Sequence, residues 1–536
     1  MNKHTSAPAV NSSSNGHSPG HVNAAESNGL SPPEWEEAVR NALTFLRMNG
    51  GDRDVAALDF KHLPPEVAVQ IVAEADRRLA FIEAAPLPEC TDLGNAELFC
   101  RLHADQLRHV KERRQWLRWQ DGRWRPDRTG EVERAAKETA RSRLRMAAAL
   151  EGEERKYQAK YALRSQDSAK VRAMIELAST EPEVVLAADA LDADPWLLGC
   201  GNGTLDLRTG ELRTPRPEDL ISAGTDVPYE PEFEPVRWLQ FLDEVFRGDR
   251  ELIGFVRRLC GYTLTGDTRE EVLAVFHGTG GNGKSKFIEV LKALLGDLAA
   301  TAAFDSFARS ANDRGARNDI ARLHRARLVV ASESGEGRHL DEATIKQLTG
   351  GDTVTARFLY AEHFEFRPQF KLVLVTNHRP RVDGDDDAIW RRLKLVPFEE
   401  CFEGPRKDRE LAAKLAAELP GILAWAVEGC LEWQRDRLGQ AGAVERATHE
   451  YREGEDVLGA FIAERCKVAA GLEVPKVELR RAYEDYCRDL GEQPMGASGL
   501  GRRLSSRGFG TERQGQSARA YRGLALIKAP SGGVGV

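Results

Sequence analysis

The stretch that decides the fold is an apolar run, Val272-Leu-Ala-Val-Phe276, followed by Gly278-Thr-Gly-Gly-Asn-Gly-Lys284-Ser285. Apolar residues then recur at helical spacing from Phe287 to Leu295. The spacing G-x-x-x-x-G-K-S between a strand and a helix is typical of a phosphate-binding loop. The sequence therefore predicts an α/β fold in which a buried strand, a glycine-rich loop and a helix form a nucleotide site.

Each part of this loop has an expected role. Backbone N–H groups can turn inward around the phosphates, where the N-terminus of the following helix adds its positive end. Lys284 would reach the β and γ phosphates, and the Ser285 hydroxyl would bind Mg²⁺. We therefore expect ATP and Mg²⁺ as cofactors. The residues expected to contact the nucleotide are Gly278, Thr279, Gly280, Gly281, Asn282, Gly283, Lys284 and Ser285.

Two further apolar runs end in polar residues, Arg327-Leu-Val-Val-Ala-Ser-Glu333 and Leu372-Val-Leu-Val-Thr-Asn377. Parallel strands present their carboxyl ends at one edge of a sheet, so we expect both ends beside the phosphate loop, with Glu333 on a neighbouring strand. Glu333 would hold the Mg²⁺ shell and orient or activate the attacking water, and Asn377 would sense the γ-phosphate. The alternative for Glu333 is a helix-capping or surface carboxylate.

An arginine pair, Arg391-Arg392, follows Trp390 and precedes another strand-like run. An arginine donated by an adjacent subunit would stabilise the charge on the transferring phosphoryl group. If the pair lies on a strand, its side chains point to opposite faces, so only one of them can face a subunit interface.

The order of the segments GTGGNGKS, LVVASE, IKQLTGGD, LVLVTN and WRRLKLVPF resembles that of superfamily 3 helicases, and most of all the helicase half of phage and plasmid primase-helicases. The resemblance implies an AAA+-like P-loop core, ATP-dependent DNA unwinding in the replication of a phage, prophage or plasmid, and a homo-oligomeric ring, expected to be a hexamer. The family pattern favours Arg392 as the catalytic arginine. Upstream, Gly94-Asn-Ala-Glu97, Trp119 to Trp124 and Gly203-Thr-Leu-Asp-Leu207 look like the domain that precedes the motor.

Two features depart from that pattern. The second strand ends in Ser332-Glu333 rather than in paired acids, so one carboxylate would serve both metal and water, with Glu336 as a candidate helper. The segment before residue 90 has neither the length nor the carboxylate motif of a primase domain. Primer synthesis is therefore expected to reside in a separate polypeptide.

Two regions are candidates for holding single-stranded or forked DNA. In superfamily 3 rings, the segment between the Glu333 and Asn377 strands is a hairpin that projects into the channel, which makes Lys346 and Arg357 candidates for phosphate or interface contacts and places Tyr360 and His363 at the tip. The alternative is an exposed hairpin with ordinary surface charges.

The second region is the tail after Val457, which is expected to form two helices, a basic helix and a strand, and resembles a winged-helix domain. Its candidate DNA-binding residues are Arg502, Arg503 and Arg507. The alternative is a solvated helix.

The overall charge is acidic, with 76 Lys and Arg against 84 Asp and Glu. Only local positive charge could therefore hold DNA. No run approaches the roughly 18 apolar residues of a membrane span, and no apolar signal segment follows Lys3. We therefore expect a cytoplasmic protein. The eight cysteines are scattered, which predicts neither a disulfide framework nor a zinc site.

The expected organisation is a disordered tail (1–33), a small helical region (34–89), an α/β domain of the type that precedes the motor (90–250), an ATPase core (251–400), a helical lid (401–455) and a winged-helix-like domain (456–530). Two functional alternatives remain at this stage. One is an AAA-type ATPase that remodels an origin without processive unwinding. The other is an initiator that binds DNA and whose nucleotide pocket is only structural.

Overall fold

The computed structural model describes residue 30 and residues 32–48, 53, 60–61, 63–308, 316–332, 338–357, 363–382, 387–492, 494–514 and 518–527. The chain divides into two compact units. The first contains Met1–Asp206 and Glu211–Gly224, and the second contains Leu207–Gly210 and Thr225–Val536. This division lies about 25 residues upstream of the boundary at residue 250 that the sequence suggested.

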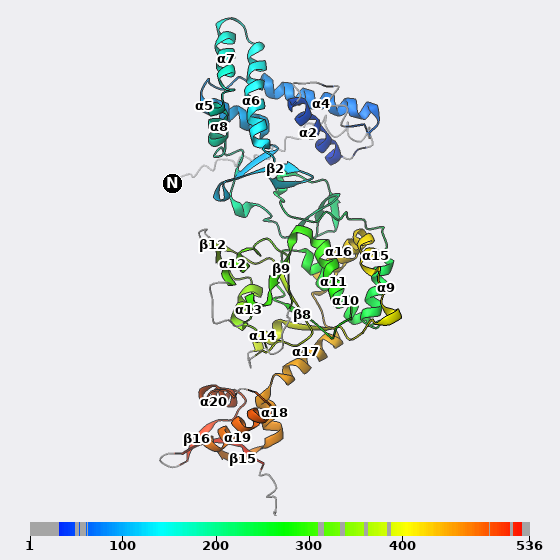
Figure 1. Cartoon of the computed structure of the whole chain (residues 1–536), viewed down its shortest axis with the longest axis vertical. Coiled ribbons are helices and arrows are strands. Elements are labelled where there is room, and N and C mark those ends of the chain that lie inside the picture. The colour runs from blue at the N-terminus through cyan, green and yellow to red at the C-terminus, as the bar shows by residue number, and fades with distance from the viewer. Residues whose placement is uncertain are drawn as a thin grey trace, which may run out of the picture. The chain divides into compact units, whose positions relative to one another are not determined.

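The first unit begins with two helices packed on each other, α2 (Pro32–Met48) and α4 (Pro65–Ala84) (Figure 1). Their contact buries Trp35, Leu46 and Ile71 among other apolar residues. Pro65 lies in the first turn of α4, where the missing N–H costs no helical hydrogen bond. The helical periodicity of this segment predicted both helices.

The rest of the first unit combines helices with two small sheets. The helices are α5 (Asp92–His103), α6 (Glu131–Ala148), α7 (Gly152–Arg164) and α8 (Ser168–Ala178). One sheet has the order β3-β2-β1-β4, from β1 (Leu107–Val110), β2 (Gln115–Gln120), β3 (Arg123–Pro126) and β4 (Val185–Leu186). The other has the order β5-β6-β7, from β5 (Leu197–Cys200), β6 (Gly203–Asp206) and β7 (Glu211–Arg213). One tight hairpin joins β2 to β3, and another joins β5 to β6.

The Gly94-Asn95 motif has a structural role in this unit. A Cβ atom on Gly94 would lie 2.1 Å from the carbonyl oxygen of Glu89, so only glycine fits there. Asn95 is 1% exposed and donates to Ser165 Oγ at 2.9 Å. Its Oδ1 accepts from Arg143, a fully buried guanidinium that also donates to the Pro88 carbonyl at 2.6 Å. Hydrogen bonds of Asn95 therefore connect α5 to α6 and to the end of α7.

The second unit is built on a five-stranded parallel sheet with the order β14-β8-β13-β10-β9. Its strands are β8 (Leu273–His277), β9 (Ala299–Ala303), β10 (Leu328–Ser332), β13 (Lys371–Thr376) and β14 (Leu393–Pro397). All except β9 are largely buried, as expected for a parallel sheet covered on both faces. His277 is in register with Thr376 and Pro397, so the carboxyl ends of β8, β13 and β14 lie at one edge.

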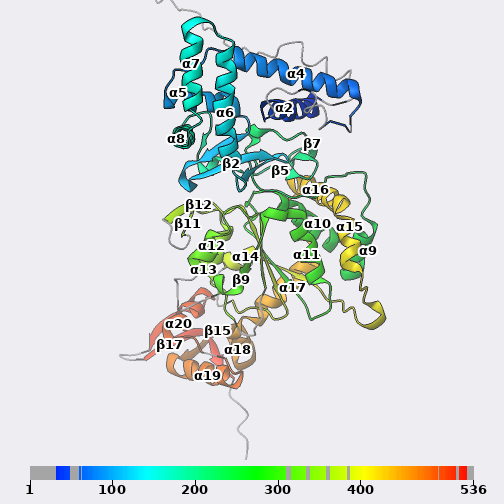
Figure 2. The same cartoon turned by 45° about the horizontal axis from the view of Figure 1, so that its top comes forward.

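Helices cover both faces of this sheet, with α10, α11 and α16 on one side and α12, α13 and α14 on the other (Figures 1 and 2). Their bounds, with those of the other elements of this part, are α9 (Val236–Val245), α10 (Arg250–Leu264), α11 (Lys284–Leu295), α12 (Ala316–Ala321), α13 (Glu342–Thr349), β11 (Val354–Arg357), β12 (His363–Phe366), α14 (Asp387–Arg392), α15 (Leu411–Ala417), α16 (Leu419–Asp436) and α17 (Gly442–Gly454).

The C-terminal part has its own apolar core, which includes Phe461, Leu479 and Leu504. Its elements are α18 (Val457–Arg465), β15 (Cys466–Pro475), α19 (Lys476–Asp489), α20 (Ala497–Ser506), β16 (Thr511–Gln514) and β17 (Ala518–Leu526). The strands form an antiparallel sheet of order β15-β17-β16. The sequence interpretation missed β15, whose central residues are mostly exposed and show no regular apolar alternation, and which pairs with the distant β17.

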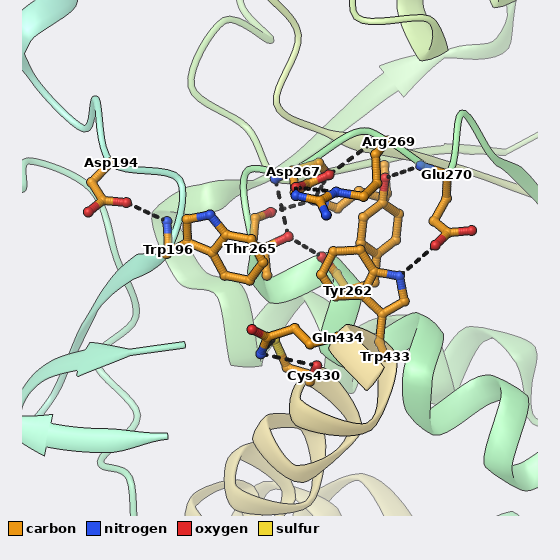
Figure 3. Close-up of polar contacts among 11 residues, drawn as sticks. Asp194, Trp196, Tyr262, Thr265, Asp267, Arg269, Glu270, Cys430, Trp433 and Gln434 are labelled. Atoms are coloured by element: carbon orange, nitrogen blue, oxygen red, sulfur yellow. Dashed lines mark hydrogen bonds and ion pairs between the residues drawn. The ribbon is translucent and has the colours of Figure 1, made fainter. Parts of the chain in front are cut away.

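The loop that leads into β8 is held by a polar network (Figure 3). The Trp433 indole donates to Glu270 Oε1 at 2.8 Å, and its ring lies 4.6 Å from that of Tyr262. The buried ammonium of Lys371 donates to the carbonyl oxygens of Thr265 and Asp267. These contacts tie α10, β13 and α16 to one short loop. Within the described ranges, no helix is long and apolar enough to cross a membrane.

Candidate nucleotide site

A tight glycine-rich loop follows strand β8 at the carboxyl edge of the sheet. Gly281 and Gly283 have φ values of 74° and 87°, which favour glycine. A Cβ atom on Gly278 would lie 2.0 Å from the Phe398 carbonyl oxygen, and one on Gly283 would lie 2.9 Å from Val245 Cγ2. The loop therefore requires glycine for both its turn and its close packing.

Lys284 begins α11 and turns its side chain back into the loop. Its ammonium donates to the carbonyl oxygens of Gly278 at 2.6 Å and Thr279 at 3.2 Å, and to Asn282 Oδ1 at 3.1 Å. The residue is only 5% exposed, and this burial lowers its pKa to about 8. Among the described residues, no carboxylate pairs with it. The positive charge is therefore available to an anion that enters the loop.

A segment after β14 supports the loop from outside. The Asn282 side-chain amide donates to the Phe398 carbonyl at 3.1 Å, and the Phe402 backbone N–H donates to the Gly281 carbonyl at 2.8 Å. Helix α9 contributes as well, because Phe241 lies against Gly283 and Trp238 packs on Phe287 of α11. The sequence interpretation did not identify this support, since these residues lie far from the loop along the chain.

We expect Gly278→Ala to weaken ATP binding strongly, because the added methyl group collides with the Phe398 backbone and forces the loop open. The control is Gly454→Ala at the end of α17, outside the loop, because a Cβ atom at Gly454 has no neighbour within 4 Å. Titration with a fluorescent ATP analogue would compare the two. Equal losses of affinity in both variants would contradict the packing argument.

The ionisation of Lys284 predicts a pH dependence of binding. Since the pKa of the buried ammonium in the nucleotide-free protein is about 8, the group loses its charge as pH rises through that value. ATP affinity should therefore be constant below about pH 7.5 and fall by up to tenfold per pH unit above about pH 8. Isothermal titration between pH 7 and 9.5 measures this. Lys286→Ala, which removes a more exposed charge on α11, should keep the same profile.

Asn377 follows β13 directly and is exposed at the same edge as the phosphate loop. Its backbone carbonyl is a hydrogen-bond partner of the His277 side chain. Burial, assisted by the positive charges of Arg379 and Lys284, lowers the pKa of His277 to about 4, so the imidazole is neutral at pH 7. The structure therefore brings Asn377, Lys284 and the loop to one edge of the sheet.

The strand that precedes Glu333 is not the neighbour of β8, contrary to our expectation. β10 pairs with β13 and β9, and β13 separates it from the phosphate loop. Ser332, its last residue, is in register with Val375 of β13. Glu333 and Glu336 lie outside the described residues. The order of the strands along the chain does not fix their order in the sheet, because parallel strands are joined by long crossover connections.

The arginine pair lies on a helix, not on a strand, and at the opposite edge of the sheet. Arg391 and Arg392 end α14, and the next residue, Leu393, is in register with Leu273 at the amino end of β8. The length of the strand separates them from the loop of the same chain by about 13 Å or more. Arg392 is mostly buried, donates to the Ala388 carbonyl at 3.0 Å and pairs with Glu271. Arg391 is exposed and makes no recorded ion pair within the described part of the chain.

The residues expected to contact DNA in the hairpin are only partly described. Arg357 and His363 are paired across β11 and β12 and are both exposed. Tyr360 lies outside the described residues. Lys346, on α13, is half-buried, and its ammonium lies 3.7 Å from the Glu342 carboxylate. Arg357 and His363 thus flank one end of a hairpin, while Lys346 lies on the preceding helix.

The three C-terminal arginines are in different environments. Arg502 on α20 is exposed, and Arg503 is half-buried. Arg507 donates to Asp456 at 2.5 Å, and the same carboxylate caps α18 by accepting from the Gly459 N–H. Arg507 therefore contributes to the packing of this domain, and Arg502 is the best placed of the three to meet a ligand.

Two family models match this chain. Residues 96–247 match a "D5 N terminal like" family, and residues 276–392 match a family of unknown function (DUF5906). The second match runs from the end of β8 through α14, and so covers the phosphate loop, Asn377 and the arginine pair.

Several similar proteins come from viruses. The chain is 31% identical to "Putative helicase L207/L206" of Acanthamoeba polyphaga mimivirus over 51% of this chain and 31% of the relative. It is 25% identical to "Putative helicase 022R" of Frog virus 3 over 52% of this chain and 37% of the relative. It is 26% identical to "Putative primase C962R" of African swine fever virus (isolate Tick/Malawi/Lil 20-1/1983) over 51% of this chain and 31% of the relative. The chain thus spans about a third of the length of these relatives.

Among solved structures, the C terminal region of NrS-1 aligns with 78% of this chain and 96% of its own, at 10% identity and a TM-score of 0.43. That score is too low to establish a common fold. The chain is therefore similar, over segments that match the D5 N terminal like and DUF5906 families, to viral proteins named putative helicases and putative primases, in agreement with its resemblance to superfamily 3 primase-helicases.

Proposed function

We propose that this protein is an ATP-driven DNA helicase motor of superfamily 3 that works as a homo-oligomeric ring, expected to be a hexamer, in the replication of a phage, prophage or plasmid. The observation that carries the proposal is the Lys284 ammonium, which is enclosed by a glycine-rich loop at the carboxyl edge of a parallel sheet and pairs with no carboxylate in the part of the chain that the structure describes. The strand order, in which β8 lies between β14 and β13, supports an AAA+-like core.

The residues at the loop fit ATP and Mg²⁺. The first turn of α11 leaves backbone N–H groups without helical partners, and the positive helix end adds to the charge of Lys284. Ser285 is exposed beside Lys284, so its hydroxyl can serve as a metal ligand. Bound Mg²⁺ would neutralise charge on the phosphates. In this proposal Glu333 orients or activates the attacking water, and Asn377 contacts the γ-phosphate.

The position of the arginine pair favours a ring. A guanidinium at the amino edge of the sheet cannot reach the phosphate loop of its own chain at the carboxyl edge, so in this proposal it contacts the loop of a neighbouring subunit. We propose that the exposed Arg391 is the stronger candidate for this contact. The preference for Arg392 came from the family pattern, and in the structure its guanidinium is held by Glu271 and the Ala388 carbonyl.

Two elements would hold DNA. The order helix, strand, helix, helix, strand, strand in the C-terminal part, with a three-stranded antiparallel sheet, supports a winged-helix domain there. Its third helix, α20, presents Arg502 to solvent and would enter a groove. The β11–β12 hairpin, with Arg357, His363 and Tyr360, would contact the strand inside the ring.

A strand-displacement assay on forked DNA with ATP and Mg²⁺ tests the function. We expect ATP-dependent release of the labelled strand by the wild-type chain, stimulated ATP hydrolysis in the presence of DNA, and neither without Mg²⁺. Vigorous hydrolysis without strand release would instead identify an ATPase that remodels DNA at an origin. Absence of both activities, with DNA binding retained, would identify a binding protein with a structural pocket.

A further inference from the structure

A cavity beside the arginine pair is only partly explained by the proposed motor. Its volume is about 700 Å³, and its walls come from α10, α14, the amino end of β14, and α17 with the segment before it. Three apolar residues in these walls, Phe255, Trp390 and Val444, are buried. Arg391 also lines the cavity, which therefore lies at the edge of the sheet where the proposed function places a neighbouring subunit.

Two lining cations, Arg391 and Lys394, have no ion-pair partner in the part of the chain that the structure describes. Among the other lining groups, Arg452 pairs with Asp387. Glu445 is an exposed acid in the first turn of α17, where the helix end favours a negative charge. Arg391 already has a proposed role at the neighbouring nucleotide. Lys394 is thus the cation that the motor chemistry leaves without a role.

An acidic segment follows strand β14 at its opposite end, beside the phosphate loop. Residues 399–403 contain three glutamates. Two arginines neutralise Glu400, whereas Glu403 is exposed and the side chain of Glu399 is 66% exposed. The Phe402 backbone N–H donates to a carbonyl of the phosphate loop at 2.8 Å, which fixes the segment to the nucleotide site. The exposed charge of this segment is therefore complementary to the unpaired charge of the cavity.

The cavity and the acidic segment cannot meet within one chain. They lie at opposite ends of β14, about 13 Å or more apart. A head-to-tail contact between two copies brings the cavity of one to the acidic segment of the next, and repetition of such a contact closes a ring. The same contact carries Arg391 towards the neighbour's phosphate loop, because the segment is hydrogen-bonded to that loop.

We propose that segment 399–403 of a second copy docks in this cavity, with Glu403 paired to Lys394, and that this contact positions Arg391 at the neighbouring nucleotide. The inference rests on the proposed ring and identifies the two surfaces that meet in it. A charged pair across an interface fixes register and orientation more than affinity. Lys394 is therefore a positioning residue.

Zero-length cross-linking locates the contact. Unlabelled and heavy-isotope-labelled full-length chains are mixed with a nonhydrolysable ATP analogue and Mg²⁺, and treated with a carbodiimide that joins an amine directly to a carboxylate. Mass spectrometry of the digest should show Lys394 joined to Glu399 or Glu403 in pairs of one labelled and one unlabelled peptide. Cross-links between copies that lie only elsewhere, or none between copies, would overturn the proposal.

Charge reversal tests the pair. Lys394→Glu and Glu403→Lys, each alone, should raise the protein concentration needed for assembly by about tenfold or more, because each places like charges opposite each other. Both changes in one chain restore opposite charges and should restore assembly at close to the wild-type concentration. Lys160→Glu, at an exposed position on α7 outside the cavity, should assemble normally. Sedimentation velocity measures assembly, and circular dichroism establishes that the variants are folded.

These outcomes are separate from those of the strand-displacement assay. Folded single variants that assemble like the wild type, or a double variant that assembles no better than the single ones, would overturn the docking contact. A wild-type chain that unwinds forked DNA without the expected cross-link would keep the helicase function and refute this contact. A chain that assembles through this contact without releasing a strand would keep the contact and refute the helicase function.

Discussion

Lys284→Ala should reduce ATP hydrolysis by about 10²–10³-fold or more, because the change removes the buried charge that would stabilise the β and γ phosphates. It also leaves the Gly278 carbonyl and Asn282 Oδ1 without the donor that now holds the loop together. Nucleotide affinity should therefore fall along with turnover. Phosphate release and titration with a fluorescent ATP analogue measure the two effects.

The matched control for that variant is Lys286→Ala. It removes the same charge two residues further along α11, where the ammonium pairs with Glu289 at the surface at 2.7 Å. We expect this control to hydrolyse ATP at close to the wild-type rate. Normal turnover by Lys284→Ala would refute the nucleotide site, and equal losses in both variants would point to damage to α11 rather than to lost phosphate contacts.

Arg391→Ala should bind ATP with unchanged affinity and hydrolyse it about 10³-fold more slowly, the scale expected for an arginine donated to a neighbouring active site. Binding persists because the phosphate loop of each chain is untouched. Mixing this variant with Lys284→Ala should restore part of the ATPase activity, since each protein lacks a different half of one composite site. Absence of rescue, with subunit exchange shown independently, would contradict the interface mechanism.

Variants of Arg392 and of its ion-pair partner Glu271 distinguish a structural role of Arg392 from a catalytic one. If the Arg392–Glu271 pair only stabilises α14 against the loop before β8, Glu271→Gln and Arg392→Ala should lower stability alike and affect hydrolysis modestly. If Arg392 instead acts on the neighbouring nucleotide, Glu271→Gln should hydrolyse ATP nearly normally while Arg392→Ala loses about 10³-fold. Thermal unfolding and phosphate release, measured on both variants, decide between the two.

The sequence by itself determined the local units of this protein. The strand, glycine-rich loop and helix from Leu273 to Leu295 follow from residue types within one short segment, because each contact that forms them is local. The same holds for the hairpin at Trp119–Trp124, where Asp121 and Gly122 adopt the positive φ values that a tight turn requires. Chemistry carried by a contiguous motif, such as the role proposed for Lys284, could therefore be predicted directly.

Only the tertiary structure decided which segments meet. Chain order suggested that the β10 strand adjoins the phosphate loop, yet β13 lies between them because crossover connections leave the order of parallel strands open. The support of the loop by Phe398 depends on a partner more than 100 residues away, as does the pairing of β14 with β8. The sequence did not reveal which element carries the arginine pair; in the structure, helix α14 buries Arg392 against Glu271 and leaves Arg391 exposed. Long-range packing rather than local pattern thus determines which of two adjacent guanidinium groups can reach another subunit.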